Sequence, residues 1–436
     1  MSEKSGAGLI SFVGLAALAA VFALWWHGSS YGAAGYAAAL VSVILFAAVC
    51  LRFVPVWIKS WEGETPCKVH EKPEHICGYI FAMIVLWDML LVASVFFIRK
   101  VSGYSGSFSD SLNYWLYLDS HHYMDIARDW YLSEGELDRL VQLVFFPGYP
   151  VAVRLMHLLI PDYTVSGFLV SMLCFAGSGC MLYKLVLLDA PHETAVRAVR
   201  FFCILPPAFF FAAPMSESLF ILCSLCCLYL VRRKRTFFGC VFGMYAAFTR
   251  SLGVLLLVPV FFELVSDRRR LKEYFEMLII PLGFAAYLLI NYLVAGDPFK
   301  FMEYQRSHWG QSFGWFFNTA AYQTEYAIRY FETGASSFFG LSLPNLAAQL
   351  ISLCIMIPAA KRLRASYTAH FIAYYVVAIG ATWLLSAPRY LAALTSLPIA
   401  LSLLSEKKMT NTLLTILCLS MGLYYITAFC CQSQVW

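Results

Sequence analysis

Apolar runs long enough to cross a lipid bilayer recur along nearly the whole chain, and they constrain its fold more than any other feature. A helix needs about 20 mostly apolar residues to cross a hydrocarbon core roughly 30 Å thick. Of the 436 residues, 61% are hydrophobic and 13% are charged, against roughly 25% charged in an ordinary soluble domain. Helices satisfy every backbone polar group within one segment, as a membrane interior requires. We therefore expect an all-α polytopic membrane protein.

The apolar runs predict about thirteen transmembrane helices. The first run begins close to the N-terminus, but a second follows at once, so we expect both to be retained as helices and neither to be a signal peptide. The predicted spans are 8–27, 33–58, 78–98, 163–187, 198–213, 216–231, 236–250, 252–265, 274–295, 338–359, 369–385, 389–404 and 411–430.

Basic residues gather in short clusters between the predicted helices, and these spans place four such clusters on one side. Cytoplasmic loops of membrane proteins carry an excess of Lys and Arg. The basic residues that give the chain its net charge of +5 therefore indicate which loops are cytoplasmic, and we expect no nucleic-acid partner. The clusters are Arg232–Arg235, Arg268–Arg270, Lys361 with Arg362 and Arg364, and Lys407 with Lys408.

The same threading places the segments 101–162 and 296–337 outside. It requires that 146–160, which contains Arg154 and His157 between prolines, does not cross the bilayer. We expect this stretch to form a helix in the outer interface.

The outer segment 110–150 carries the most informative residues. It contains Asp119, His121, His122 and Tyr123 in close succession. A carboxylate beside two imidazoles at a membrane surface is suited to act as a general base, to bind a metal or to recognise a sugar. The alternative interpretation is a solvated loop.

Several other polar residues are predicted to lie at the same face. Glu217 follows one outer turn, Arg250 lies where two short spans meet, and Arg389 with Tyr390 begins a late span. The second long outer segment contributes Gln305, Arg306, His308 and Trp309. Charges at membrane depth are costly and usually mark a site. One such residue can be an interfacial anchor, but their convergence indicates a cavity that opens outside.

The residues of these segments and their order along the chain resemble the motifs of the GPI mannosyltransferase II (PIG-V-like) family, within the GT-C superfamily of membrane glycosyltransferases. That family carries Trp-Asp-x-x-His/Phe-Tyr/Phe-x-x-Ile-Ala in its first outer loop. The later elements are Phe-Phe-Pro-Leu-Tyr-Pro, Pro-x-x-Glu-Ser-Leu-Phe, Thr-Arg-Ser-x-Gly and a late Arg-Tyr. The matching residues here are Asp119, His122, Tyr123, Ile126 and Ala127, then Phe145–Pro150, Pro214 with Glu217–Phe220, Thr249–Gly253 and Arg389-Tyr390.

The resemblance implies a GT-C-like fold with outer-face loop helices and a catalytic domain over 78–405. Residues 1–77 would then form extra transmembrane helices with a cytoplasmic loop, and 406–436 a C-terminal helix. Two departures bear on the acceptor: Leu118 replaces the family's tryptophan before the aspartate, and Gly148 replaces a bulkier residue.

The resemblance further implies an inverting glycosyltransferase, a mannosyltransferase by the family's usual sugar. It would move a sugar from a polyprenyl- or dolichyl-phosphate donor to a glycan or glycolipid acceptor at the extracytoplasmic or lumenal face. We assign the general base to Asp119 and stabilisation of the donor phosphate to Arg250 and Arg389. The residues expected to contact acceptor or sugar are His121, His122, Tyr123, Glu217, Gln305, His308, Trp309 and Tyr390.

Metal binding is left open by the sequence. A monoanionic phosphate donor does not require a metal, although Asp119, Asp125, His121 and His122 offer ligands for a divalent cation. A second candidate group, Cys67, His70, His75 and Cys77, has zinc ligand types in a spacing that matches no common motif.

Two other functions compete with the transferase. A transporter or lipid flippase would also have many helices and a few deep charges, although no internal repeat is visible. A non-catalytic scaffold would need no converging carboxylates and arginines.

Asp88 follows Trp87 within an apolar span, and we interpret it as a buried polar residue.

Overall fold

The computed structural model describes residues 3–62, 76–132, 141–431, 433 and 435. Over these residues the regular structure is helical, apart from one isolated β-bridge between Phe313 and Ala381. Seven described helical segments are long and apolar enough to cross a membrane, which confirms a multi-pass integral membrane protein. They are Gly6–Gly28, Ala33–Trp61, Ile76–Val101, Tyr163–Val186, Leu271–Ala295, Ala335–Ala359 and Lys408–Cys430.

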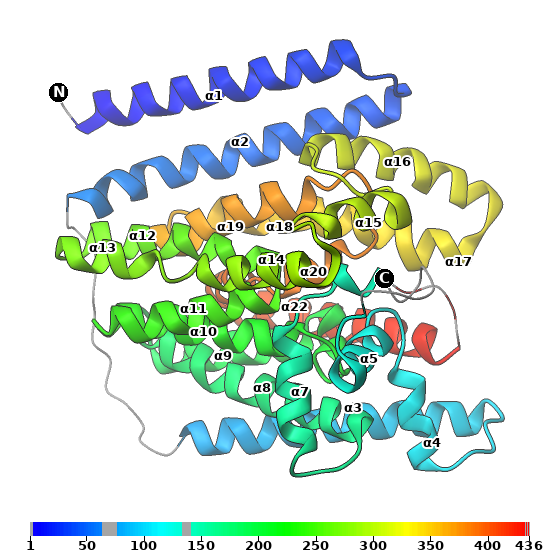
Figure 1. Ribbon diagram of the computed structural model, residues 1–436. Helices are drawn as coiled ribbons and strands as arrows, with labels where there is room; N and C mark the ends of the chain where they lie inside the picture. Colours follow the sequence, from blue (N-terminus) through cyan, green and yellow to red (C-terminus); the bar gives the residue numbers. More distant parts are fainter. Residues whose placement is uncertain (1–2, 63–75, 133–140, 432, 434, 436) are drawn as a thin grey trace.

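The first two helices form a hairpin on the outside of the bundle. In Figure 1, α1 (Glu3–Gly28) is the outermost helix and α2 (Ala33–Trp61) lies between it and the rest. None of the apolar window of α1 is buried, so in a membrane this helix faces lipid. One end is fastened by Trp25, whose Nε1 donates to Asn318 Oδ1 at 2.9 Å.

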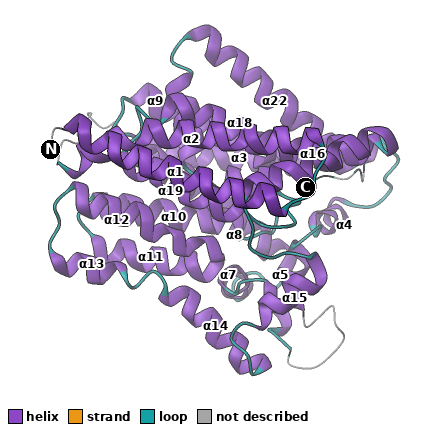
Figure 2. Ribbon diagram, turned by 90° about the horizontal axis from the view of Figure 1, so that it is seen from above, coloured by secondary structure: helices purple, strands orange, loops and turns teal. Residues whose placement is uncertain are grey.

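The centre of the bundle is built from helices that approach closely through small residues. A side chain placed on Gly239 in α11 (Thr236–Thr249) would lie 2.9 Å from the carbonyl of Cys227 in α10 (Glu217–Arg232). Such close contacts drive helix association where no water is present to be released. The other helices of the bundle are α3 (Ile76–Val101), α8 (Tyr163–Val186), α9 (His192–Ile204), α12 (Leu257–Ser266), α13 (Leu271–Met277), α14 (Leu282–Ala295), α18 (Leu343–Ala359), α19 (Ala365–Ile379), α20 (Ala387–Ala392), α21 (Ser396–Leu404) and α22 (Lys408–Cys430). Seen from above, α22 and α14 lie at opposite edges (Figure 2).

Short helices gather at one end of the bundle (Figure 1). Among them α7 (Gly148–His157) runs across the direction of the long helices and is too short to cross a bilayer. A helix therefore forms within 146–160, where a non-crossing helix is expected. The other short elements at this end are α4 (Phe108–Leu112), η1 (Asn113–Trp115), α5 (Ser120–Asp129), η2 (Val141–Val144), α15 (Lys300–Trp309), α17 (Ala335–Ser337) and η5 (Phe338–Ser342), and the longer α16 (Phe316–Thr333) lies beside them.

The four basic clusters meet at the other end. Arg269 Nη2 donates to the carbonyl of Val231 at 3.0 Å, and Arg364 lies 3.4 Å from Asp267. Arg362 is bonded to Glu406, beside the last cluster. Contacts between residues far apart in sequence thus place all four clusters together, away from α4, α5 and α15.

Several predicted spans differ from the observed helices. The span 274–295 is interrupted at 278–281, between α13 and α14, and the span 389–404 at 393–395, between α20 and α21. The span 369–385 is wrong at its end, because α19 stops at Ile379 and 380–386 is irregular. The span 198–213 breaks at Ile204, where two prolines follow that cannot continue the helical hydrogen bonds. A 3₁₀-helix, η3 (Pro206–Phe211), takes their place, and a second, η4 (Ser251–Leu256), precedes α12.

Candidate functional site

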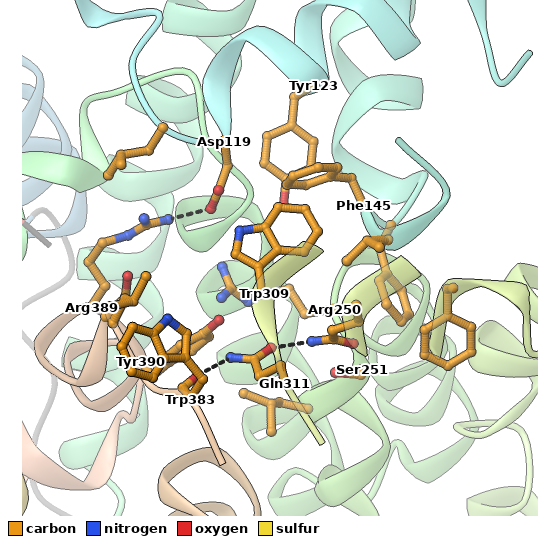
Figure 3. Close-up of a pocket in the computed structure, with 18 of the residues that line it drawn as sticks. Asp119, Tyr123, Phe145, Arg250, Ser251, Trp309, Gln311, Trp383, Arg389 and Tyr390 are labelled. Atoms are coloured by element: carbon orange, nitrogen blue, oxygen red, sulfur yellow. Dashed lines mark hydrogen bonds and ion pairs between the residues drawn. The ribbon is translucent and has the colours of Figure 1, made fainter. Parts of the chain in front are cut away.

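A cavity of about 410 Å³ opens among the short helices and loops. The residues that line it come from segments as far apart in the sequence as 117–123 and 383–390 (Figure 3). The lining comprises Tyr117, Leu118, Asp119, Tyr123, Val144, Phe145, Phe146, Thr249, Arg250, Ser251, Leu252, Phe301, Gln305, Trp309, Gln311, Leu341, Trp383, Leu385, Ser386, Arg389, Tyr390 and Val435.

Asp119 lies at the start of α5, directly after the chain turns sharply. Leu118 has a positive φ of 51°, a strained value for a residue with a side chain, and Asp119 is the residue before the first turn of α5. Its Oδ2 accepts a hydrogen bond from Arg389 Nη2 at 3.0 Å. The side chain is 38% exposed, and among the described residues its other oxygen has no hydrogen-bond donor. One carboxylate oxygen is therefore anchored and the other is open to a ligand.

Glu217 joins the two arginines of the site. Its Oε1 lies 2.6 Å from Arg389 Nη2 and 2.9 Å from Arg250 Nη1. The Glu217 side chain is 0% exposed and does not line the cavity. The carboxylates of Asp119 and Glu217 and the two guanidinium groups form a cluster whose formal charges balance. We therefore reassign Glu217 from a sugar contact to a counter-ion that holds both arginines, because it has no surface with which to touch a ligand.

Tyr123 and Tyr390 support Arg250. The hydroxyl of Tyr123 is 2.9 Å from Ser216 Oγ, which also accepts from Arg250 Nη1 at 3.1 Å. Burial raises the pKa of Tyr123, so its hydroxyl stays neutral and can donate. The guanidinium of Arg250 lies 5.3 Å from the centre of the Tyr390 ring, within the range of a cation–π contact.

The three predicted histidines do not line the cavity. His121 and His308 are exposed, and the ring of His308 contacts Trp309 with centroids 5.7 Å apart. His122 stacks on Phe145 at 4.5 Å and so lies behind a residue of the cavity wall. Direct contact of these rings with a sugar therefore stays a prediction, and the cavity lining does not include them.

The second outer segment contributes Gln305 and Trp309 to the cavity, as expected, and also Gln311. Gln311 Nε2 donates to the carbonyl of Trp383 at 2.7 Å. Sequence reasoning missed Gln311 and Trp383, because each lies in an irregular loop whose partner is distant in the sequence. The sequence feature that could have indicated them is the mixture of polar and aromatic residues in both loops.

The two departures from the family pattern have different environments. Leu118 lines the cavity beside Asp119. Gly148 does not; a side chain there would meet Thr249 Oγ1 at 2.4 Å, and its carbonyl accepts from Tyr245 at 2.9 Å. The glycine therefore allows α7 to pack against α11.

The metal candidates receive no geometric support from the described part of the chain. No group of three or more His, Cys, Asp or Glu side chains there is placed to hold a metal ion. Cys67, His70 and His75 lie outside the described residues. Asp125 pairs with Arg128 at 2.6 Å on the surface of α5.

Asp88 is fully buried, and neither carboxylate oxygen has a hydrogen-bond partner among the described residues. It does not line the cavity, in agreement with its interpretation as a buried polar residue outside the site.

Comparison with known proteins adds no relative. Neither a scan against protein-family models nor a search of curated proteins finds a match to this chain. The cavity combines an open carboxylate oxygen with two fixed cations. Such a site can take a proton from a hydroxyl and stabilise an anion that forms nearby.

Proposed function

We propose that this protein is a glycosyltransferase that uses a sugar carried on a polyprenyl or dolichyl phosphate. The observation that carries the proposal is the 3.0 Å contact between Asp119 and Arg389 at the wall of a cavity that also contains Arg250. The resemblance to the PIG-V-like family adds mannose as the expected sugar. The acceptor would be a glycan or glycolipid.

The proposed reaction divides between the carboxylate and the arginines. Asp119 takes the proton from an acceptor hydroxyl, whose oxygen attacks C1 of the donor sugar. The bond from C1 to the phosphate oxygen breaks, and the phosphate leaves with the electron pair. Arg250 and Arg389 stabilise the negative charge that grows on that oxygen. Attack from the face opposite the phosphate inverts the anomeric centre.

A GT-C-like fold with about thirteen crossings is part of this proposal. The seven long segments leave shorter apolar helices, including Thr236–Thr249, Ser251–Ser266 and Ala365–Ile379, as further candidates. The grouping of the basic clusters at the end away from the cavity supports an extracytoplasmic or lumenal site through the positive-inside rule.

Replacing Asp119 tests the proposal most directly. In Asp119→Asn the side chain keeps its size but cannot take a proton, so turnover should fall by about two to four powers of ten. The assay uses purified protein in nanodiscs with mannosyl-phosphoryl-dolichol and a synthetic mannosyl glycolipid, and measures dolichyl phosphate released. Asp125→Asn, on the exposed side of α5, is the matched control and should transfer at the wild-type rate.

Two results would contradict the proposal. A folded Asp119→Asn protein that transfers normally would remove Asp119 as the base. Movement of the intact glycolipid between leaflets, without release of dolichyl phosphate by the wild-type protein, would establish the flippase alternative instead.

A further inference from the structure

Two outer loops, distant in sequence, are joined into one wall of the cavity. The backbone N–H of Ser312 donates to Thr382 Oγ1 at 2.8 Å, and the N–H of Thr382 donates to the carbonyl of Ser312 at 2.9 Å. Phe313 and Ala381 form the isolated bridge beside them. We call the paired segments 310–314 and 380–383 the loop clasp.

Helix α16 fixes the second half of the loop clasp. Tyr322 accepts from the N–H of Leu384 at 2.6 Å, and Gln323 donates to the carbonyl of Leu384 at 2.6 Å. The Trp383 ring stacks on Tyr322 with centroids 6.1 Å apart and meets Tyr326 edge-on at 5.2 Å. Trp383 is therefore held in one orientation before any ligand binds, which lowers the entropic cost of binding.

The wall formed in this way carries no charge. Gln311 accepts from Gln305 and donates to the carbonyl of Trp383, and Trp309 lies on the same stretch of chain. All four residues line the cavity. Each amide retains further donor or acceptor capacity beyond these bonds, whereas the charged groups, Asp119, Arg250 and Arg389, belong to other elements (Figure 3).

We infer that this wall, formed by Trp383, Gln311, Gln305 and Trp309, is the subsite for a neutral sugar of the acceptor. A pyranose ring offers an apolar face of C–H groups that packs on an indole, and hydroxyls at its edge that exchange hydrogen bonds with amides. The inference rests on the proposed function, in which the arginines take the donor phosphate. The donor sugar, bound to that phosphate, must then lie near the arginines, which leaves the neutral wall to the acceptor.

A binding measurement tests the subsite without any transfer. Methyl α-D-mannopyranoside is titrated into the full-length protein in nanodiscs, and saturation-transfer NMR reports binding. Trp383→Ala and Gln311→Ala should each weaken binding by about tenfold, a loss of roughly 1.4 kcal/mol. Trp315→Ala is the matched control, because Trp315 is an exposed tryptophan of the same outer segment that does not line the cavity. Methyl glucuronide, which is charged, should bind more weakly than the mannoside to the wild-type protein.

Kinetics separate the subsite from the proposed function. In Gln311→Ala the KM for a mannosyl glycolipid acceptor should rise, while the KM for mannosyl-phosphoryl-dolichol stays unchanged. Wild-type mannoside affinity in both Gln311→Ala and Trp383→Ala, or a rise in donor KM alone, would overturn the inference. Mannoside binding that Trp383→Ala abolishes, in a protein with no transfer activity, would instead refute the transferase and leave the sugar site standing. If Trp383→Ala does not fold, mannoside binding by Trp383→Phe and Gln311→Ala tests the inference in the same way.

Discussion

A single oxygen of Glu217 holds both arginines of the cavity. Arg250 and Arg389 each direct one nitrogen at Oε1, so their guanidinium groups are close together although their charges repel. Without the buried carboxylate, two cations would face each other in a poorly hydrated site, at a cost of several kcal/mol. The arrangement therefore supplies two cations in fixed positions with a charge that is largely compensated.

Replacement of Glu217 by glutamine should damage both stability and turnover. Removing one partner of a buried ion pair costs about 3–5 kcal/mol, and the freed arginines should shift from their positions. We expect turnover per folded molecule to fall by at least about tenfold. Thermal unfolding followed by tryptophan fluorescence, with transfer assayed on the same samples, measures both effects.

Glu263 offers a matched control at the other end of the bundle. It is also buried and also lies between two arginines, 2.8 Å from Arg364 and 3.7 Å from Arg232. Glu263→Gln should lower the unfolding temperature to a similar degree and leave turnover per folded molecule near the wild-type value. Equal loss of turnover in both variants would mean that Glu217 acts only through stability.

The residues brought together at the site were partly foreseeable. Asp119, Arg250, Arg389 and Tyr390 stand out in the sequence as polar residues at the ends of apolar runs, and all of them line the cavity. Burial was not foreseeable, because it depends on side-chain direction; Glu217 turned inward, behind the arginines, and His121 outward.

At the scale of elements, the apolar pattern located the long helices well and the irregular segments poorly. The stretch 369–385 reads as one apolar run, yet α19 ends at Ile379. The backbone after it is satisfied by partners from elsewhere, including Thr319 Oγ1, which donates to the carbonyl of Ile379 at 2.7 Å. Hydropathy measures how apolar a segment is, and it carries no information about such distant partners.

The contact between α7 and α11 should tolerate no added methyl group. A side chain on Gly148 would come within 2.8 Å of the Cα of Thr249, and Thr249 directly precedes Arg250. In Gly148→Ala the two helices must separate, so we expect a loss of about 1–3 kcal/mol of stability together with slower transfer. The unfolding temperature and the transfer rate of the purified variant check both expectations.

Gly78→Ala is the control for that substitution. Gly78 also lies in the first turn of a helix, and a side chain there meets no atom within 4 Å. It should leave both measurements unchanged. An unaltered unfolding temperature in Gly148→Ala would contradict the prediction, because it would show that α7 and α11 can move apart without loss of stability.

The whole molecule is polarised along the direction of its helices. Its basic clusters gather at one end and its cavity at the other, so the positive-inside rule assigns the two ends to opposite sides of the membrane. The separation of the basic clusters from the cavity could be predicted from the sequence, because it depends only on where these residues fall along the chain. The assignment of each end to one side of the membrane stays a prediction.

Cysteine labelling tests this orientation. In a background lacking the exposed Cys354 and Cys431, a membrane-impermeant maleimide added to intact cells should label Asn113→Cys and Met302→Cys. It should reach Arg233→Cys and Arg270→Cys only after the membrane is opened. All four positions are exposed in the folded protein. Labelling of the two arginine positions in intact cells would therefore show that the protein has the opposite orientation in the membrane.

Asp119 and Arg389 are 270 residues apart in the chain, and this separation has a consequence for biosynthesis. A membrane protein is made from its N-terminus, so the carboxylate reaches the membrane surface long before its arginine has been translated. A chain that ends before residue 389 cannot contain the paired site. We therefore expect the site to be completed only after α20, which carries Arg389, has been made and has packed against the earlier helices. Until then, a nascent chain in the membrane has the carboxylate without its arginine partner.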